Sequence, residues 1–579
     1  MRNTILPKRI LSFTLPCLLT TVLLGQPPKQ WDKRFGGTDF EYFSALQQTK
    51  DGGYILGGFS YSGIGGDKTE ESRGSNDYWV VKVDANGEKQ WDKRFGGTDE
   101  DYLGSVEQTT DGGYVLGGWS HSGIGGDKTE ASWGSYDYWV VKIDANGVKQ
   151  WDKRFGGTGT DKLASLEQTT DGGYILGGLS HSGIGGDKTE EHRGDYDYWV
   201  VKIDANGVKQ WDKTFGGALD DELHSLQQTT DGGYVLIGYS NSGIAGDKSE
   251  ESRGSYDYWA VKIDANGVKQ WDKTFGGTSF ENATSLQQTT DGGFILGGYS
   301  ESGIGGDKTE DSRGYYDYWV VKIDANGLKQ WDKRFGGTDY DECESVQQTV
   351  DGGYILGGYS ASGIGGDKTE NSRGYTDYWV VKINAIGIKQ WDKRFGGTYY
   401  DNATSLQQTT DGGYVLGGWS QSGIGGDKTE ESRGSDDYWI VKVGCPPNST
   451  VIPSGTLDIC QTDSIVLHAY SADGCKYQWI RDSKIILGAT DSTYAATRPG
   501  IYRVLVYTRK LCADISKPIK IISSCNRSND ISIYPNPSNG IVTLTYNSIH
   551  AGTVQLNVYD KTGRLMFSQK ETAIEGSNT

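Results

Sequence analysis

The stretch Gln90–Lys149, QWDKRFGGTDEDYLGSVEQTTDGGYVLGGWSHSGIGGDKTEASWGSYDYWVVKIDANGVK, decides the fold because the chain repeats it seven times. Its opening string, QWDK followed by Arg or Thr and then FGG, begins at Gln30, Gln90, Gln150, Gln210, Gln270, Gln330 and Gln390, so the period is 60 residues. Self-similarity of this length indicates an array of structural units. A chain of 579 residues is also too long for one ordinary hydrophobic core.

Each repeat predicts four β-strands and no helix. In the numbering of the first repeat, the strands are expected at 44–49, 54–60, 77–84 and 88–95. The turns Asp51-Gly52-Gly53 and Asn86-Gly87 separate alternating runs, and such dipeptides are strong hairpin signals. The third strand has apolar residues on both faces, as a blade between two neighbours requires. The fourth carries charged residues around Trp91, which suits an outer edge.

Together these signals predict an all-β fold with a seven-bladed β-propeller, four strands per blade, over residues 26–444. A β-solenoid is the alternative, but four turn signals in each repeat fit it poorly. The last repeat stops at Val443, after its third strand, whereas Gln30–Phe35 at the beginning is a fourth strand without a blade. Pairing Gln30–Phe35 with Tyr438–Val443 would close the ring.

Two resemblances accompany this prediction. The segment Ile143–Trp151 resembles the tryptophan-docking repeats of quinoprotein-like propellers, although the adjacent Cys–Cys pair of their quinone-binding members does not occur. The whole repeat more closely resembles the Gly- and Trp-rich repeats of secreted Bacteroidetes propellers. Most of those have no assigned activity, so the resemblance implies a fold and export but no reaction.

Residues 1–25 have the features of a signal peptide. Arg2, Lys8 and Arg9 form a basic start, and an apolar run follows from 10 to 24. A membrane anchor is the alternative, but a run of about 15 residues is shorter than the roughly 20 that a spanning helix needs. No later stretch is apolar enough to span, so we expect an exported protein that is not transmembrane.

After the propeller, residues 445–525 are expected to form an immunoglobulin-like β-sandwich. Ile465–Ala469 would be its second strand and Tyr477–Trp479 its third, while Tyr502 would form the tyrosine corner of this fold.

Cysteines cluster in the same part of the chain. Five of the six that follow the signal peptide lie after residue 444, which in an exported protein predicts one or two disulfides. Zinc binding is the alternative, but no C-x-x-C pair is present. The usual inter-sheet cysteine positions hold Ala469 and Val504, so we expect a Cys460–Cys512 bridge in place of the usual one.

The final residues, 526–579, resemble the C-terminal sorting domain of the Bacteroidetes type IX secretion system. The motif that carries this resemblance consists of Ile533-Tyr534-Pro535-Asn536-Pro537, Gly540, Leu544, Val558-Tyr559-Asp560 and Gly563-Arg564. It implies the type IX machinery as a partner, and a location outside the cell or on its outer surface, reached through the periplasm. The family continues into a further hairpin, so we expect an incomplete domain and either a fragment or impaired export.

Charge and ligand chemistry narrow the function. The formal net charge of −19 disfavours nucleic acid and anionic lipid as partners. We expect no cofactor, with calcium as an open possibility: Asp67 and Glu70 recur in an acidic loop, yet Lys68 separates them and no D-x-D-x-D-G pattern occurs. A solvated loop is the alternative. His121 and His181, at equivalent positions, suggest either a metal pair or variable loop residues.

The loops between the second and third strands, and between the fourth strand and the next blade, should emerge on one face. The repeats differ most in these loops, and loops on a rigid scaffold are where binding usually occurs. The candidate binding residues are Tyr102, Phe280, Tyr399, Tyr400, Asp101 and Asp401.

Three functions remain open from the sequence. A multivalent binding or adhesion scaffold, with a glycan or protein ligand, fits repeated loops around one rim. An enzyme such as a lyase or a quinoprotein would need an asymmetric set of residues, and the acids that could supply one are Glu100, Asp101, Asp161, Asp220 and Asp221. The repeats are alike, so we expect no enzyme. A structural spacer is the third candidate.

Overall fold

The computed structural model describes residues 27–444, 451–453, 456–460, 464–469, 475–508, 513–523, 532–534, 543–548, 551–574 and 576–578. The predicted signal peptide therefore lies outside the described residues. Every regular element within them is a β-strand. Among the described residues, no helix is long and apolar enough to cross a membrane.

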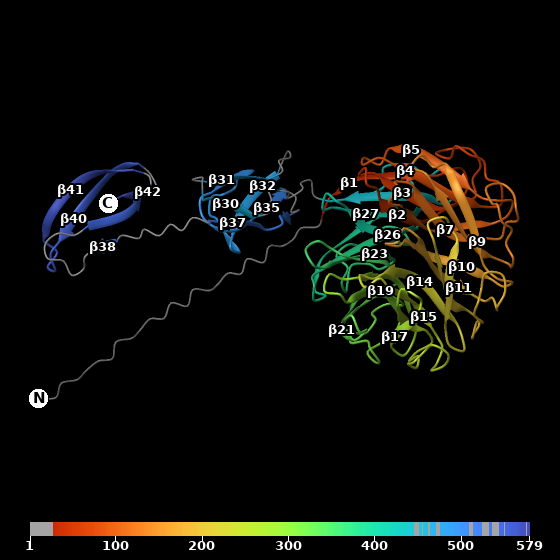
Figure 1. Ribbon diagram of the computed structural model, residues 1–579. Helices are drawn as coiled ribbons and strands as arrows, with labels where there is room; N and C mark the ends of the chain where they lie inside the picture. The colour runs from red at the N-terminus through yellow and green to blue at the C-terminus, as the bar shows by residue number, and fades with distance from the viewer. Residues whose placement is uncertain are drawn as a thin grey trace, which may run out of the picture. The chain divides into compact units, whose positions relative to one another are not determined.

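Seven four-stranded antiparallel sheets form the blades of a propeller (Figure 1). Blade 1 consists, from its inner to its outer strand, of β2 (Glu41–Gln48), β3 (Tyr54–Ser60), β4 (Asp77–Val83) and β5 (Lys89–Phe95). The next blades repeat these positions: blade 2 has β6 (Asp101–Gln108), β7 (Tyr114–Ser120), β8 (Asp137–Ile143) and β9 (Lys149–Phe155); blade 3 has β10 (Asp161–Gln168), β11 (Tyr174–Ser180), β12 (Asp197–Ile203) and β13 (Lys209–Phe215); blade 4 has β14 (Asp221–Gln228), β15 (Tyr234–Ser240), β16 (Asp257–Ile263) and β17 (Lys269–Phe275). Blades 5 and 6 follow the same order: β18 (Glu281–Gln288), β19 (Phe294–Ser300), β20 (Asp317–Ile323) and β21 (Lys329–Phe335); then β22 (Asp341–Gln348), β23 (Tyr354–Ser360), β24 (Asp377–Ile383) and β25 (Lys389–Phe395). This confirms the predicted fold class.

Blade 7 joins the two ends of the repeat region. It combines β26 (Asp401–Gln408), β27 (Tyr414–Ser420) and β28 (Asp437–Val443) with β1 (Lys29–Phe35) from the beginning of the chain. Strand β1 pairs antiparallel with β28, from Lys29 opposite Val443 to Phe35 opposite Tyr438. The ring closure expected from the phase of the repeat is therefore present.

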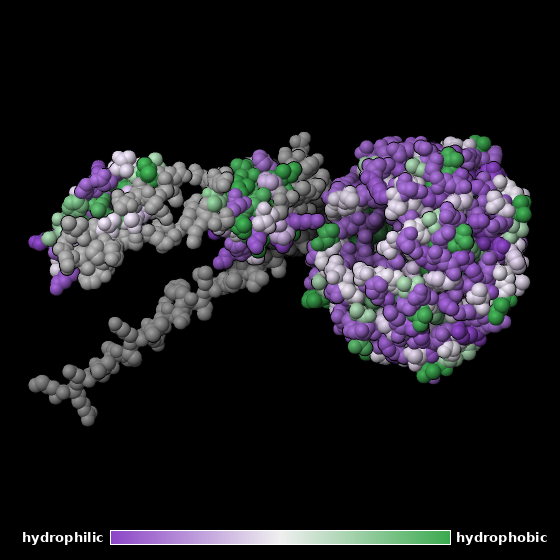
Figure 2. All heavy atoms as spheres, in the orientation of Figure 1, coloured by the Kyte–Doolittle hydropathy of each residue, from purple (hydrophilic) through white to green (hydrophobic). Residues whose placement is uncertain are grey.

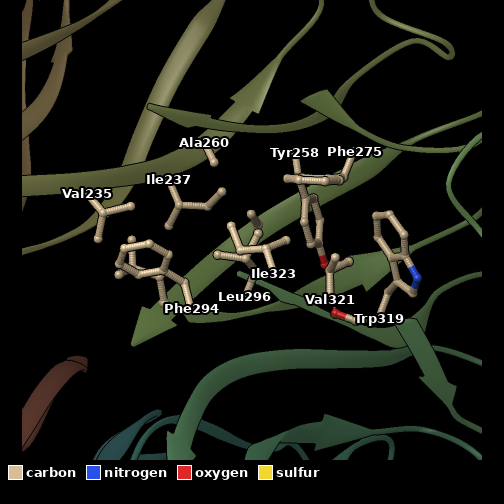
Figure 3. Packing of buried hydrophobic residues seen from close by; sticks show 12 residues of the cluster. Val235, Ile237, Tyr258, Ala260, Phe275, Phe294, Leu296, Trp319, Val321 and Ile323 are labelled. Carbon is tan, nitrogen blue, oxygen red and sulfur yellow. The ribbon is translucent and has the colours of Figure 1, made fainter. Parts of the chain in front are cut away.

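The hydrophobic core lies between neighbouring blades. Figure 3 shows the cluster between blades 4 and 5, in which Tyr258 and Phe275 of one blade meet Phe294 and Trp319 of the next. The hydroxyl of Tyr258 donates a 2.9 Å hydrogen bond to the backbone carbonyl of Trp319. Because third strands such as β20 are buried along their whole length, each blade needs a neighbour on both sides.

The two faces of the ring carry different loops. Tight turns such as 49–53 and 84–88 lie on one face, and Gly52 and Gly87 take positive φ values of 84° and 81° there. The opposite face, which we call the long-loop face, carries loops 61–76 and 96–100 and their repeats. These two loops lie side by side, since the amide of Asp101 donates to the carbonyl of Asn76 across the blade junction.

Two strand predictions needed correction. The inner strand begins at Glu41 rather than at residue 44, because a β-bulge after Phe43 lets pairing continue past an unpaired residue. The charged residues of the outer strand are not a solvated edge, since Asp92 is 3% and Arg94 8% exposed. Both are covered by the long loops.

The part after the propeller contains two sheets that fit the expected sandwich. One sheet contains β29 (Val451–Ile452), β31 (Ile465–Ala469) and β34 (Thr493–Ala496). The other contains β30 (Thr456–Asp458), β37 (Ile519–Ile522), β35 (Gly500–Thr508), β32 (Cys475–Arg481), β33 (Lys484–Ile485) and β36 (Ala513–Ile515). Trp479 is fully buried, and the hydroxyl of Tyr502 donates a 2.8 Å hydrogen bond to the carbonyl of Arg498, as a tyrosine corner does. The immunoglobulin assignment itself stays a prediction.

Only one of the two cysteines in the predicted disulfide lies among the described residues. Cys460 is disulfide-bonded, whereas Cys512 lies outside the described residues. The pairing of these two cysteines therefore stays a prediction.

The last region is also built of strands. A sheet contains β38 (Ser532–Tyr534), β39 (Thr543–Ser548) and β42 (Gly576–Asn578), and a hairpin contains β40 (Gly552–Tyr559) and β41 (Leu565–Ala573). Pro535, Asn536, Pro537 and Gly540 of the sorting motif lie outside the described residues.

Candidate binding surface

Ion pairs between blades hold the long loops in place. The carboxylate of Asp127, in the long loop of blade 2, pairs with both Arg73 and Arg94 of blade 1, at 2.7 Å in each case. The amide of Asp127 also donates to the carbonyl of Gly96. Each loop is thus tied to the preceding blade, so the face behaves as a scaffold with fixed loops.

The two acids considered for calcium binding also take part in ion pairs. Asp67 pairs with Arg34 at 2.7 Å and with Arg433 at 2.8 Å, and Glu70 pairs with Lys93 at 3.0 Å. Each carboxylate therefore has at least one cationic partner. The ion pairs of Asp67 link the loop to the preceding blade, and calcium binding by Asp67 and Glu70 stays a prediction.

Asp101 and Asp401 are not surface residues. Both are 0% exposed at the first position of an inner strand. Asp101 accepts hydrogen bonds from the amide of Gly97 at 2.7 Å and from the hydroxyl of Ser122 at 3.0 Å, and Asp401 has the same partners in its own blade. Burial raises the pKa of both carboxyls. These two residues hold the loop between blades, and neither is exposed to a ligand.

Tyr102 lies in the inner strand β6 and Phe280 in the loop before β18, and both are partly covered by other rings. Tyr102 stacks on Trp119 with centroids 5.4 Å apart and meets Phe59 edge-on at 4.8 Å. Phe280 packs between Tyr256 and Tyr316 of the two flanking blades. These ring–ring contacts hold the two side chains in place and leave little of either ring free to contact a ligand.

Exposed rings gather at two neighbouring blade junctions. Tyr375 and Tyr400 stack at 4.7 Å with planes 16° apart, and Tyr315 and Tyr340 stack at 4.8 Å and 10°. Tyr375 is 61% and Tyr315 60% exposed, so each pair keeps an open ring face. We call these two pairs the tyrosine platforms. Beside the first, a shallow open depression is lined by Arg373, Gly374, Tyr375, Thr398 and Tyr399.

Tyr399 and Tyr400 were among the candidate binding residues from the sequence, whereas Tyr315, Tyr340 and Tyr375 were not. The signal was nevertheless present, because the string RGS before the third strand becomes RGY only in the copies at Tyr315 and Tyr375. No other junction carries two tyrosines at these two positions. The long-loop face therefore has stacked tyrosine pairs at two blade junctions and not at the other five.

The histidines considered as a metal pair, and the acids considered for catalysis, contact side chains near their own blades. His121 lies 3.2 Å from the carboxylate of Asp99, and the ring of His181 lies 5.1 Å from that of His192. Among the described residues, no group of three or more His, Cys, Asp or Glu side chains is placed to hold a metal ion.

Of the acids considered for catalysis, Asp161 and Asp221 are buried like Asp101. Glu100 accepts a 2.5 Å hydrogen bond from Tyr136, and Asp220 accepts a 3.4 Å one from Tyr256. The structure does not bring these four acids together into one set.

The inner wall of the ring also differs between blades. The inner strands each contain a β-bulge, and the bulged residues are Ser44, Gly104, Ala164, His224, Thr284, Glu344 and Thr404. No two neighbouring blades share a residue type there. This position falls inside a strand, and its bulge is a property of the strand pairing that the sequence pattern does not show.

Comparison with known proteins supports export. Residues 532–579 match a family model described as a secretion system C-terminal sorting domain. This match supports a type IX sorting tail, and with it secretion to the cell surface or the extracellular space.

The repeat region is similar to one curated protein and to several solved structures. The regulatory protein FlaEY of Caulobacter vibrioides is 24% identical in an alignment of 392 residues that covers 62% of this chain and 40% of that protein. The chain thus spans about two fifths of the length of that relative. The structure of BBS1N in complex with ARL6DN is 10% identical, covering 73% of this chain and 99% of that one, with a TM-score of 0.39. An apocarotenoid oxygenase from Synechocystis is 10% identical, covering 68% and 88%, with a TM-score of 0.34. At these values the likeness concerns fold alone, and the propeller assignment rests on its seven sheets.

Proposed function

We propose that the protein is a secreted or surface-displayed binding scaffold whose propeller binds glycans on the long-loop face. The observation that carries this proposal is the pair of tyrosine platforms. Each presents an open phenol face beside polar groups, a combination suited to the apolar face of a sugar ring. Arg373, beside Tyr375, offers further donors at the edge of the depression.

The rest of the surface supports a glycan over a large protein partner. Figure 2 shows a propeller surface that is mostly hydrophilic, with apolar residues scattered singly on the face in view. The depression at Tyr375 and Tyr399 is shallow and open. Protein interfaces usually have an apolar buried core, whereas sugars can be bound by isolated rings with polar surroundings.

Two neighbouring platforms would also add avidity. They occupy equivalent positions one repeat apart, at the junctions of blades 5 and 6 and of blades 6 and 7. A ligand with repeated sugar units could contact both, and its second contact would be effectively intramolecular. Multivalency is thus proposed for two junctions.

A glycan array with the purified full chain tests this proposal. We expect retention of a subset of glycans, and loss of that signal in the double variant Tyr315→Ala/Tyr375→Ala. Val148→Ala, at a 60% exposed position on the opposite face, is the matched surface control and should bind like the wild type. Retention of the signal by the double variant would contradict the proposal, and so would an array without any binding.

A further inference from the structure

Blade 3 differs from the other blades at two positions of its long loop, 181–196. His181 opens this loop and His192 lies further along it. Histidine occurs at the position of His181 in one other repeat, as His121 of blade 2. The position of His192 is serine in the other six repeats: Ser72, Ser132, Ser252, Ser312, Ser372 and Ser432. Blade 3 is thus the one repeat with histidine at both positions.

The serine that His192 replaces normally takes part in the internal hydrogen bonds of the loop. In blade 1 the hydroxyl of Ser72 accepts a 2.7 Å hydrogen bond from Nζ of the buried Lys68 and donates to the carbonyl of Ser62 at 2.8 Å. In blade 3 the equivalent lysine, Lys188, donates to the hydroxyl of Thr214 at 2.6 Å. The buried lysine therefore keeps a hydroxyl partner without residue 192, and the His192 side chain makes different contacts.

The imidazole of His192 lies against that of His181. The two ring centroids are 5.1 Å apart and the ring planes are inclined by 39°. Nδ1 of His192 lies 2.7 Å from the backbone carbonyl oxygen of Gly194. Because a carbonyl can only accept, Nδ1 carries the proton and Nε2 keeps its lone pair. Histidines that bind a metal through one nitrogen almost always donate from the other to a carboxylate, a backbone carbonyl or water.

The surroundings of His181 also differ from those of its counterpart in blade 2. Nδ1 of His121 lies 3.2 Å from the carboxylate of Asp99. The repeat places Gly159 where blade 2 has Asp99, so His181 lacks this carboxylate partner. Its ring instead meets His192 and, with centroids 5.6 Å apart, Tyr196. The acid that holds the single histidine of blade 2 is thus absent from the repeat that has two.

We propose that His181 and His192 form a binding site for a divalent transition metal ion such as zinc, with Nε2 of His192 as one ligand. Imidazole nitrogen suits zinc, copper and nickel, whereas calcium prefers oxygen. Two imidazoles bound tetrahedrally to one ion at about 2.0–2.1 Å have ring centres roughly 5 Å apart, as these two have. Among the described residues no third His, Cys, Asp or Glu side chain joins the pair, so water or a further ligand would fill the other positions.

This metal site is separate from the tyrosine platforms and does not depend on the proposed glycan binding. The platforms lie at the junctions of blades 5, 6 and 7, whereas both histidines belong to blade 3. A failed glycan array would therefore leave the metal site untouched, and a failed zinc titration would leave the platforms untouched.

Calorimetric titration of the full chain, without a histidine tag, with zinc chloride tests the site. His192→Ser and His181→Ala introduce residues that other repeats have at these positions, as in Ser72 and Ala361, so neither should lower the melting temperature measured without zinc. Each removes one of two ligands and should weaken zinc binding at least about tenfold, since loss of a mere outer-shell partner already costs about 10–100-fold. His121→Ala is the matched control and should change the affinity less than about twofold.

X-ray absorption at the zinc edge gives a second measurement that needs no variant. We expect two imidazole nitrogens at about 2.0–2.1 Å, with oxygen in the remaining positions. If the double variant His181→Ala/His192→Ser binds zinc as tightly as the wild type, the two rings merely stack and the proposal is wrong. Equal weakening by His121→Ala, or a spectrum without two imidazole ligands, would also overturn it.

Discussion

The indole Nε1 of Trp439 donates a 3.1 Å hydrogen bond to Oδ2 of Asp32, 407 residues earlier in the chain. Trp79 makes the same bond to Asp92 at 3.2 Å within blade 1, where the two strands are joined by a tight turn. The ring is thus closed with the contacts that each blade uses internally. The difference is that the closing strand has no turn linking it to its partner.

This difference predicts unequal effects of equivalent substitutions. Asp32 accepts from Trp439, and from the amide and hydroxyl of Thr429 at 2.9 and 3.0 Å. Asp32→Ala leaves these donors unpaired, at a cost of about 1–3 kcal/mol for each one that stays buried. Strand β1 can then detach and expose the edge of β28, which promotes association between chains. We expect a lower melting temperature and concentration-dependent oligomers by light scattering.

Asp92→Ala is the matched control, because Asp92 has the same donors in Trp79 and Thr69. It should lower the melting temperature but leave the protein monomeric, since the turn retains the outer strand. Equal behaviour of the two variants would show that the closing strand is held as firmly as the others.

The buried acids predict an unusual dependence of stability on pH. Burial raises the pKa of Glu41 to about 7, and it raises that of Asp77 and its equivalents Asp137, Asp317 and Asp377 to about 6. Their folded pKa values exceed the unfolded values near 4, so the folded state binds more protons between pH 4 and 7. The stability these groups contribute is full below pH 4 and is lost as the pH rises through 6 to 7.

Other titratable groups oppose this loss of stability with rising pH, some at acidic pH and some at alkaline pH. The pKa of Asp51 is lowered to about 2, with hydrogen bonds from Thr49 and Lys82 outweighing burial, so its stabilisation is lost below about pH 4. Burial lowers the pKa of Lys128 to about 8, so stability recovers above that pH. We expect the melting temperature to peak near pH 5 and to fall by several degrees at pH 7.5. Glu41→Gln should reduce that fall, and a flat or rising profile would contradict the assignment.

The repeat made most of the fold predictable. The glycines at 52 and 87 mark both hairpins, and the fourth strand left over at Gln30 predicts the closure with Tyr438–Val443 that the structure shows. The two faces also follow from the alternation of antiparallel strands. These features depend on the residue types in the turns and on the number and phase of the repeats, both of which can be read directly from a sequence.

The site was predicted less well, for physical reasons. The sequence around Asp101 does not show whether its carboxylate is solvated or accepts hydrogen bonds from Gly97 and Ser122, because its burial depends on the neighbouring blade. The bulge at Glu344 is a property of strand register, which the hydrophobic pattern does not reveal. Tyr315 and Tyr375 were visible as departures from the repeat, but their pairing with Tyr340 and Tyr400 required the packing of adjacent loops.

The disulfide in the sandwich-like region gives a further prediction. Cys460 is disulfide-bonded, and we expect Cys512 to be its partner. Non-reducing proteolysis followed by mass spectrometry should yield a linked peptide that contains both cysteines. Cys343, buried and free, provides the internal control and should be alkylated only after denaturation. A link from Cys460 to Cys475 or Cys445 would replace the predicted pairing.

The tyrosine platforms predict how affinity should depend on the number of intact junctions. Tyr315→Ala and Tyr375→Ala each remove the open ring of one pair, which is 60% and 61% exposed, so neither should disturb the fold. For a glycan long enough to span both platforms, each single variant should weaken binding about tenfold or more because avidity is lost. For a monovalent fragment of that glycan, the same variant should change affinity by less than about twofold, since the second platform is still intact. Surface plasmon resonance with the two ligand lengths separates these cases. If one single variant abolishes binding of the short fragment as well, a single asymmetric site carries the interaction and the two-platform account is wrong.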